Sequence, residues 1–287
     1  MDMTSRATWD RHPRRLRSTV TAARWRIESE RWSWPRAGAR PHPGLRRFLA
    51  RDYWGVTAQS PPHRLLVPAT ASVPLVLKLA DSPHRPPAFM HGVHGRYSIL
   101  DGDCARSYLE IQLAPLGAYR LLGRPIHELG ADIVDLEAVL GAAARRLLEA
   151  VRDEPTWPGR FALVDDFLLW AADQGPSPAP EVARAWQLLA GEGGTTMIPV
   201  AQVADEVGWS HKHLITKFTA QVGLTPKTVS RIARFERVLA RVRTGRRLPG
   251  WGQVAADFGY ADQAHLIREF RDFAGTTPTD YLQRVGG

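Results

Sequence analysis

The chain has 287 residues, which is enough for two domains with separate hydrophobic cores. Apolar residues make up 44% and charged residues 23% of it, as in ordinary globular proteins. The net charge of +9 and the pI near 10.3 indicate a polyanionic partner, either nucleic acid or an acidic membrane surface. The single cysteine, Cys104, excludes intramolecular disulfides and fits a reducing cytoplasm, and no window approaches 18 consecutive apolar residues, so we expect no membrane span.

Basic residues gather at the two ends of the chain. Residues 1–51 carry 13 Lys/Arg against 4 Asp/Glu, residues 52–195 carry 12 against 17, and residues 196–287 carry 13 against 8. Residues 1–40 contain ten arginines and four tryptophans without a sustained period. We therefore predict a basic, disordered tail at 1–40, and the alternative is an arm that adds contacts to phosphates.

Residues 41–190 are predicted to form a β-rich domain with a helical second part. Apolar and polar residues alternate at 75–79 and 109–113, as expected for strands with one apolar face. Short strands at close spacing, separated by turn residues, favour a small antiparallel barrel or sandwich. Weaker strand candidates are 64–67 and 96–100. After Pro115 the period becomes helical, and the predicted helices are 116–122, 136–151, 160–172 and 181–190.

Residues 191–287 contain an internal repeat, which begins after the glycine-rich segment 191–194. Gln202–Trp209 matches Gln253–Tyr260 at an offset of 51. After one inserted residue the match continues at an offset of 52, pairing His213-Leu214 with His265-Leu266, Phe218 with Phe270, Gly223 with Gly275 and Pro226 with Pro278. Each copy reads as helix, tight turn, helix and stop, which predicts two helix-turn-helix units.

The turn residues of both copies fit this prediction. Gly208 and Gly259 occupy the point where the chain must reverse within a few residues, a position that favours positive φ. Ser210 and Asp262 stand where the next helix needs an N-cap oxygen. Between the copies, 226–244 is predicted to be one helix with an apolar stripe of Ile232, Phe235, Leu239 and Val242. A rigid helix there would let two recognition helices enter successive major grooves, about 34 Å apart.

This pattern resembles the DNA-binding domain of the AraC family of bacterial transcription regulators. The residues that carry the resemblance are Val203-Ala204, Gly208-Trp209-Ser210, His213-Leu214, Phe218, Gly223 and Pro226, then Arg231-Ile-Ala-Arg234, and then Val254-Ala255, Gly259-Tyr260, His265-Leu266, Phe270 and Gly275-Thr-Thr-Pro278. The resemblance implies a sequence-specific regulator that binds asymmetric double-stranded DNA through recognition helices near 211–222 and 263–274. The N-terminal half is similar to the sensor region of one AraC subgroup, around 114–125 and 134–137.

The outward faces of these helices carry the candidate DNA contacts. Predicted base contacts are His211, Lys212, Ile215, Thr216, Gln263, Ala264, Ile267 and Arg268. Predicted phosphate contacts are Thr219, Thr225, Arg231, Arg234, Arg271 and Thr276. Arginine suits guanine, glutamine suits adenine, and isoleucine suits a thymine methyl group. Without the repeat, such polar faces would be interpreted as solvated helix surface, and for His213 and His265 we expect local packing.

The sequence therefore predicts an α+β chain: a β-rich sensor-like domain with trailing helices, then an all-α domain of two helix-turn-helix units joined by a linker helix. We expect no catalytic residue, no metal site and no cofactor, since residues three apart, such as His91 and His94, point to opposite faces of a strand. Cys104 lacks an activating cation for redox sensing. The expected partner is DNA, and RNA polymerase, a small-molecule effector and a second copy are further candidates. The alternatives are a DNA-targeted enzyme with a cupin-like barrel, and an architectural DNA-binding protein.

Overall fold

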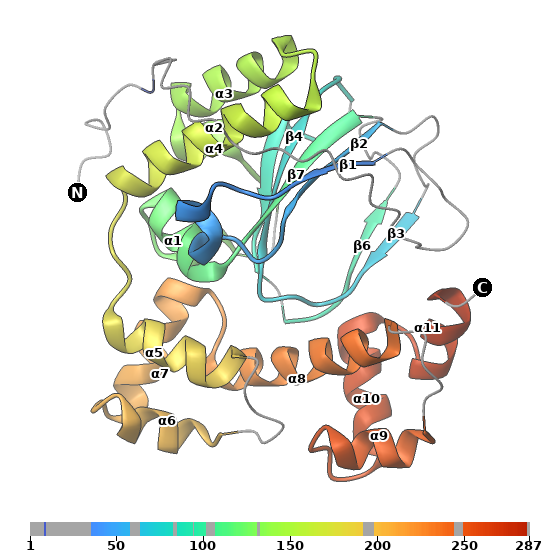
Figure 1. The fold of residues 1–287 in the computed structure, drawn as a ribbon. Coiled ribbons are helices and arrows are strands. Elements are labelled where there is room, and N and C mark those ends of the chain that lie inside the picture. Colours follow the sequence, from blue (N-terminus) through green and yellow to red (C-terminus); the bar gives the residue numbers. More distant parts are fainter. Residues whose placement is uncertain are drawn as a thin grey trace.

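In the computed structural model, the chain folds into a β-rich N-terminal domain and a helical C-terminal domain (Figure 1). The structure describes Trp9 and residues 36–57, 64–82, 85–93, 95–101, 107–130, 133–191, 198–243 and 249–285. Most of the predicted tail at 1–40, together with His84, His94 and Cys104, lies outside the described residues. No helix in the described part of the chain is both long and apolar enough to cross a membrane.

The N-terminal domain is built on a six-stranded antiparallel sheet of order β1-β2-β7-β4-β5-β8, beside a two-stranded sheet of β3 and β6. The strands are β1 Arg36–Ala39, β2 Tyr53–Thr57, β3 Arg64–Val67, β4 Val73–Lys78, β5 Ala88–His91, β6 Ser98–Asp101, β7 Ser107–Leu113 and β8 Ile133–Asp135. The strands predicted from alternation at 75–79 and 109–113 are confirmed as β4 and β7, and the weaker candidates at 64–67 and 96–100 correspond to β3 and β6. The sheet begins at Arg36, inside the segment predicted as a tail.

The period-two pattern fixes the pairing of β4 with β7. Leu75 lies opposite Ile111 and Leu77 opposite Leu109, and all four side chains are buried on the core face. Lys78, expected on the polar face, is also buried. The segment that follows β4 covers it, because the Lys78 Nζ donates to Ser82 Oγ at 2.5 Å and to the Arg85 carbonyl at 2.7 Å.

Helices cover the core side of this sheet. They are α1 Pro115–Leu122, α2 Leu136–Leu140, α3 Ala142–Asp153 and α4 Trp157–Gln174, with short 3-10 helices η2 Pro43–Phe48 and η3 Ile126–Leu129. The single helix predicted at 136–151 is divided into α2 and α3 at Gly141, whose φ of +59° and ψ of −145° suit glycine. Trp9 packs on α4 through an edge contact with Phe167, and its carbonyl accepts a hydrogen bond from Arg146.

Seven helices of the described residues make up the C-terminal domain: α5 Pro180–Ala190, α6 Val200–Glu206, α7 His211–Val222, α8 Pro226–Arg243, α9 Trp251–Asp257, α10 Gln263–Ala274 and α11 Pro278–Val285. Helix α5, which precedes the sequence boundary at 191, packs on α6, α7 and α8 in one apolar cluster. A second cluster joins α8, α9 and α10. The predicted stripe of α8 is buried in the second cluster, and Val229 of the same helix is buried in the first. The helix holds one unit at each end (Figure 1).

Candidate DNA-binding surface

The two repeats fold as two helix-turn-helix units with the same turn. Gly208 has a φ of +72° and Gly259 one of +74°, in the left-handed region that the sequence pattern predicts for them. The residue after each glycine bonds back to the first helix of its unit: the Trp209 N–H donates to the Ala204 carbonyl, and the Tyr260 N–H donates to the Ala255 carbonyl. The units are therefore structural repeats as well as sequence repeats.

N-caps fix where the second helix of each unit begins. The side chain of Ser210 accepts from the His213 N–H at 3.3 Å, and that of Asp262 accepts from the His265 N–H at 2.6 Å. Helix α7 thus begins at His211 and α10 at Gln263. The one-residue insertion therefore lies in the turn of the second helix-turn-helix unit. His213 and His265 pack edge-on against Trp209 and Tyr260, which confirms the local packing expected for both histidines.

The eight predicted base-contact residues occupy four equivalent positions in α7 and α10. Six of them are exposed, and Ile215 and Ile267 are half-exposed. The equivalent pairs, 52 residues apart, are His211 with Gln263, Lys212 with Ala264, Ile215 with Ile267, and Thr216 with Arg268. Each recognition helix therefore presents one continuous outward face at the same four positions, with different side chains at three of them.

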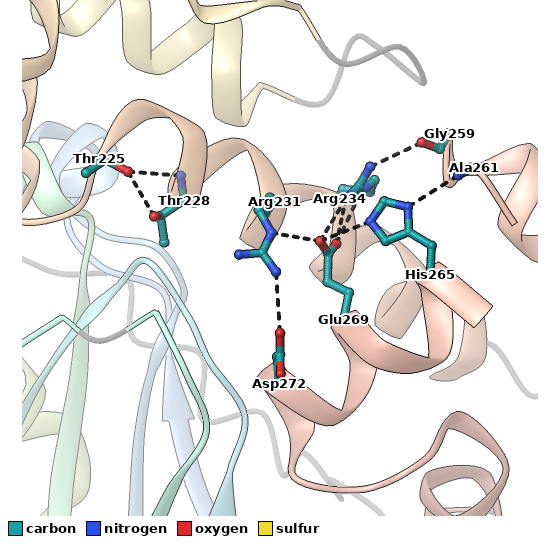
Figure 2. Close-up of polar contacts among 9 residues, drawn as sticks. All are labelled: Thr225, Thr228, Arg231, Arg234, Gly259, Ala261, His265, Glu269 and Asp272. Atoms are coloured by element: carbon teal, nitrogen blue, oxygen red, sulfur yellow. Dashed lines mark hydrogen bonds and ion pairs between the residues drawn. The ribbon is translucent and has the colours of Figure 1, made fainter. Parts of the chain in front are cut away.

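The residues predicted to contact phosphate are less uniform. Arg271 and Thr225 are exposed, and Thr219, the equivalent of Arg271, is half-exposed. Thr225 is also the residue before α8, where its hydroxyl accepts from the Thr228 N–H at 3.2 Å (Figure 2). Thr276 is buried, and Thr277, the equivalent of Thr225, bonds to Asp280 at the start of α11.

The structure does not support a phosphate contact for Arg234 or Thr276. Arg234 is only 4% exposed, and its guanidinium donates to both carboxylate oxygens of Glu269 and to the Gly259 carbonyl (Figure 2). Its Cζ also lies 4.1 Å from the centre of the Tyr260 ring. Arg234 therefore joins α8 to the turn and recognition helix of the second unit.

Arg231 also bonds within the protein. Its guanidinium lies 2.8 Å from Glu269 and 3.6 Å from Asp272 (Figure 2). It also covers the Phe273 ring, with its Cζ 4.9 Å from the ring centre. We therefore do not retain Arg231 among the candidate phosphate contacts.

Burial, together with the charge of Glu269, raises the pKa of the Tyr260 phenol well above its usual range, so this side chain is neutral at physiological pH.

Glu269 is the central residue that sequence reasoning missed. It is 1% exposed and sits on the same helix face as Leu266, Phe270 and Phe273. An acid within an apolar face is a signal that could have identified it, because a buried carboxylate requires a cationic partner. The sequence does not show that this partner is 35 residues away, on α8.

The N-terminal domain contacts both units. The Ala69 N–H donates to the Phe273 carbonyl at 2.7 Å and the Tyr97 N–H to the Asp272 carbonyl at 3.4 Å, so N-terminal loops bond to carbonyls in the last turn of α10. At the first unit, η3 packs against α7, and a Cβ at Gly223 would lie 2.3 Å from Val93 and 2.7 Å from Ile126. In Figure 1 the sheet lies on one side of α8, with α6 and α9 on the other.

Of the two histidines weighed above as metal ligands, His91 lies on β5 and His94 lies outside the described residues. Among the residues that the structure describes, no group of three or more His, Cys, Asp or Glu side chains is arranged to hold a metal ion.

Two helix-turn-helix units with exposed recognition helices are typical of DNA-binding proteins, and this arrangement places the protein in that class. Residues 182–284 match the family model described as a helix-turn-helix domain, and residues 38–135 match a domain of unknown function, DUF6597. The C-terminal domain is an AraC-type helix-turn-helix domain, and the chain is a DNA-binding transcription regulator.

Solved structures of ToxT from Vibrio cholerae are similar to this chain at low sequence identity. One is 12% identical and covers 80% of this chain and 92% of its own, with a TM-score of 0.40. Another is 13% identical and covers 80% and 93%, with a TM-score of 0.42. A form described as bound to an unsaturated fatty acid is 10% identical and covers 87% and 91%, with a TM-score of 0.38. No curated protein matches the sequence significantly.

Proposed function

We propose that the protein acts in the cytoplasm by recognising an asymmetric, two-part DNA site, one part with α7 and the other with α10. The observation that carries this proposal is the exposure of the same four positions on both helices. At about 1.5 Å per residue, the 18 residues of α8 span about 27 Å and separate the units rigidly. That separation suits two recognition helices that enter neighbouring major grooves on one face of the DNA.

Chemical differences between the equivalent positions support unequal half-sites. In the second unit, Arg268 can bond guanine O6 and N7, and Gln263 can bond adenine N6 and N7. The first unit offers Thr216 and His211 at those positions, which are weaker or less selective donors. We therefore expect the α10 half-site to be the more strictly defined one, with Ile215 and Ile267 facing thymine methyl groups.

Two further residues suit the DNA backbone, whereas Thr219 does not, because its hydroxyl oxygen is buried. Arg271 lies one turn beyond the base-contact positions of α10, and Thr225 is exposed just before α8. Contacts of this kind set orientation and carry little sequence information. We assign them phosphate contact in place of the wider set expected from the sequence.

In vitro selection of DNA by the full-length protein tests this proposal. We expect a two-part motif whose halves are centred about one helical turn apart. The same selection with Arg268→Ala should relax the α10 half only, and with Thr216→Ala, the equivalent position, the α7 half only. A single-part motif, or relaxation of both halves by either variant, would refute two-part recognition.

We further propose that the N-terminal domain controls DNA binding through its contacts with both units. Thr70 carries one of these contacts, because its hydroxyl donates to Glu236 on α8 at 3.0 Å. A ligand or a second copy that shifts the N-terminal loops would thereby change the relative placement of α7 and α10. Such a shift would change how tightly the protein binds its two-part DNA site, and therefore the fraction of time that the promoter is occupied.

The variant Thr70→Val tests this control. It removes the hydroxyl that bonds Glu236. Thr57→Val is the matched control, because the Thr57 hydroxyl bonds to Ser107, a residue of its own domain. We expect DNA affinity, measured by fluorescence anisotropy, to change about tenfold or more for Thr70→Val, since one hydrogen bond to a charged group contributes about 1.5–3 kcal/mol. For Thr57→Val it should stay within about twofold. Equal behaviour of the two variants would show that this contact does not couple the domains.

A further inference from the structure

A basic pocket opens on the N-terminal domain between the end of β1 and the start of β2. It has a volume of about 290 Å³ and is lined by Arg40, Pro41, Arg46, Leu49, Ala50, Arg51 and Asp52. All of the charged side chains in this lining are exposed. Three arginines and one aspartate give the pocket a formal charge of +2.

The three guanidinium groups of the pocket have no ion pair or hydrogen bond with another residue of the described chain. Elsewhere in the same domain arginines are paired, as Arg145 is with Glu137 and Arg152 with Asp81. Unpaired guanidinium groups that converge on one hollow are suited to oxyanions, because their planar donor forks match carboxylate and phosphate groups. The Asp52 carboxylate adds an acceptor for a hydroxyl group at the same place.

We propose that this pocket binds the effector, a small hydroxylated metabolite with two or more carboxylate or phosphate groups. The volume is at the lower end for small-molecule sites, which favours a compact metabolite. Hydroxy-polycarboxylates and sugar bisphosphates share this chemistry. The inference rests on the proposed control of DNA binding by the N-terminal domain and specifies the ligand class that exerts it.

A chain of hydrogen bonds leads from the pocket to the DNA-binding domain. The N–H of Ala50, in the pocket lining, donates to the Gln112 carbonyl on β7 at 2.8 Å, and the Gln112 side chain accepts from Ser72 Oγ at 2.6 Å. The Ser72 N–H donates to Thr70 Oγ1 at 3.2 Å, and the Thr70 hydroxyl in turn donates to Glu236 on α8. Movement of segment 49–52 around a ligand would thus reach the linker helix through directly bonded groups.

Isothermal titration calorimetry on the full-length protein tests the pocket. The probes are citrate, a hexose bisphosphate, and tricarballylate, which is citrate without its hydroxyl group, all at ionic strength held constant with chloride. We expect citrate or the hexose bisphosphate to bind, and tricarballylate to bind more weakly than citrate. Arg46→Gln should weaken binding roughly tenfold, as expected for a lost charged hydrogen bond.

Arg47→Gln is the matched control, because Arg47 is the next residue of η2 but stacks over Phe48 and does not line the pocket. It should leave the affinity within about twofold. Absence of binding by all the probes, or equal effects of the two substitutions, would overturn the proposed site.

DNA binding distinguishes failure of the ligand proposal from failure of the proposed function. The wild-type protein should bind its selected DNA without a probe, and the bound probe should change that affinity; in Thr70→Val the probe should still bind but leave the DNA affinity unchanged. If the probe binds and DNA affinity never responds, the pocket is not an effector site. If duplex DNA competes with the probe for the pocket, the arginines contact DNA phosphates and the metabolite proposal is wrong. Failure to select any DNA motif would instead refute two-part recognition and leave the calorimetric result standing.

Discussion

Arg234 and Glu269 form a buried ion pair between the linker helix and the second recognition helix. Arg234 Nη2 is 2.8 Å from both carboxylate oxygens of Glu269, and the two side chains are 5% and 1% exposed. Arg231 adds a second cation at 2.8 Å. Because Glu269 is on the inner side of α10 and Arg268 beside it is exposed, the pair holds the base-reading face of α10 at a fixed angle to α8.

Loss of this carboxylate should destabilise the protein strongly. Glu269→Ala leaves the Arg234 charge buried without its partner, and we expect the free energy of unfolding to fall by about 3–5 kcal/mol. Urea denaturation followed by tryptophan fluorescence measures it. Glu137→Ala, which breaks the exposed pair with Arg145, is the control and should cost less than about 1 kcal/mol. Comparable losses for the two variants would show that the buried pair is not a structural link.

Base and phosphate contacts on α10 should respond differently to salt. Arg271→Ala is expected to lower affinity for all DNA sequences and to reduce the slope of log affinity against log salt by about one. Arg268→Ala should cost about 1–3 kcal/mol on the preferred site and less on a site changed at the contacted guanine. Anisotropy titrations from low to moderate salt, on matched and changed duplexes, measure both effects. A loss of base preference in Arg271→Ala would reverse the two assignments.

Substitutions at two glycines with positive φ should distinguish the cost of backbone strain from the cost of disturbing the contact between the domains. Gly208 has open space around its position, so Gly208→Ala should cost only the left-handed conformation, about 1–2 kcal/mol. Gly223 has a similar φ of +86°, but an added Cβ would also press on Val93 and Ile126 of the N-terminal domain. Gly223→Ala should therefore cost a further 1–3 kcal/mol, roughly, in urea denaturation. If both substitutions cost the same, the first unit does not pack tightly on that domain.

The acid dependence of stability should depend on Asp165. Its Oδ1 accepts hydrogen bonds from the His42 N–H and the Tyr53 hydroxyl, but burial dominates and raises its pKa above the usual 3.8; burial and the Asp165 charge likewise raise the pKa of Asp166. The folded state thus binds protons that the unfolded chain has released, so these groups make the free energy of unfolding fall as the pH rises above about 4.

Asp165→Asn should flatten this fall, because an amide oxygen accepts the same two hydrogen bonds without a charge. The measurement is urea denaturation at a series of pH values between about 4 and 7. Asp173→Asn, at an exposed position of α4, is the control and should follow the wild-type curve. An unchanged slope in Asp165→Asn would contradict the raised pKa.

The sequence by itself determined the two helix-turn-helix units. Their apolar spacing, the glycines at 208 and 259 and the caps at 210 and 262 act within one or two helical turns, and each is visible in neighbouring residues. The same holds for β4 and β7, whose alternation predicts both the strands and their buried faces. One local signal was missed, because Gly141 divides a helix that the apolar period alone would continue.

Only the tertiary structure decided which polar residues remain available for DNA. Arg234 lies off the apolar stripe of α8, so the sequence pattern predicts that it is exposed. In the structure it is buried together with its ion-pair partner Glu269, which is 35 residues away. The bond from Thr70 to Glu236 spans 166 residues, and the arginines of the basic pocket are brought together by the segment between β1 and β2, which contains η2. Periodicity describes which face of an element is apolar, whereas the partner of a buried charge and the contact between two domains depend on how separate elements pack, which no local pattern contains.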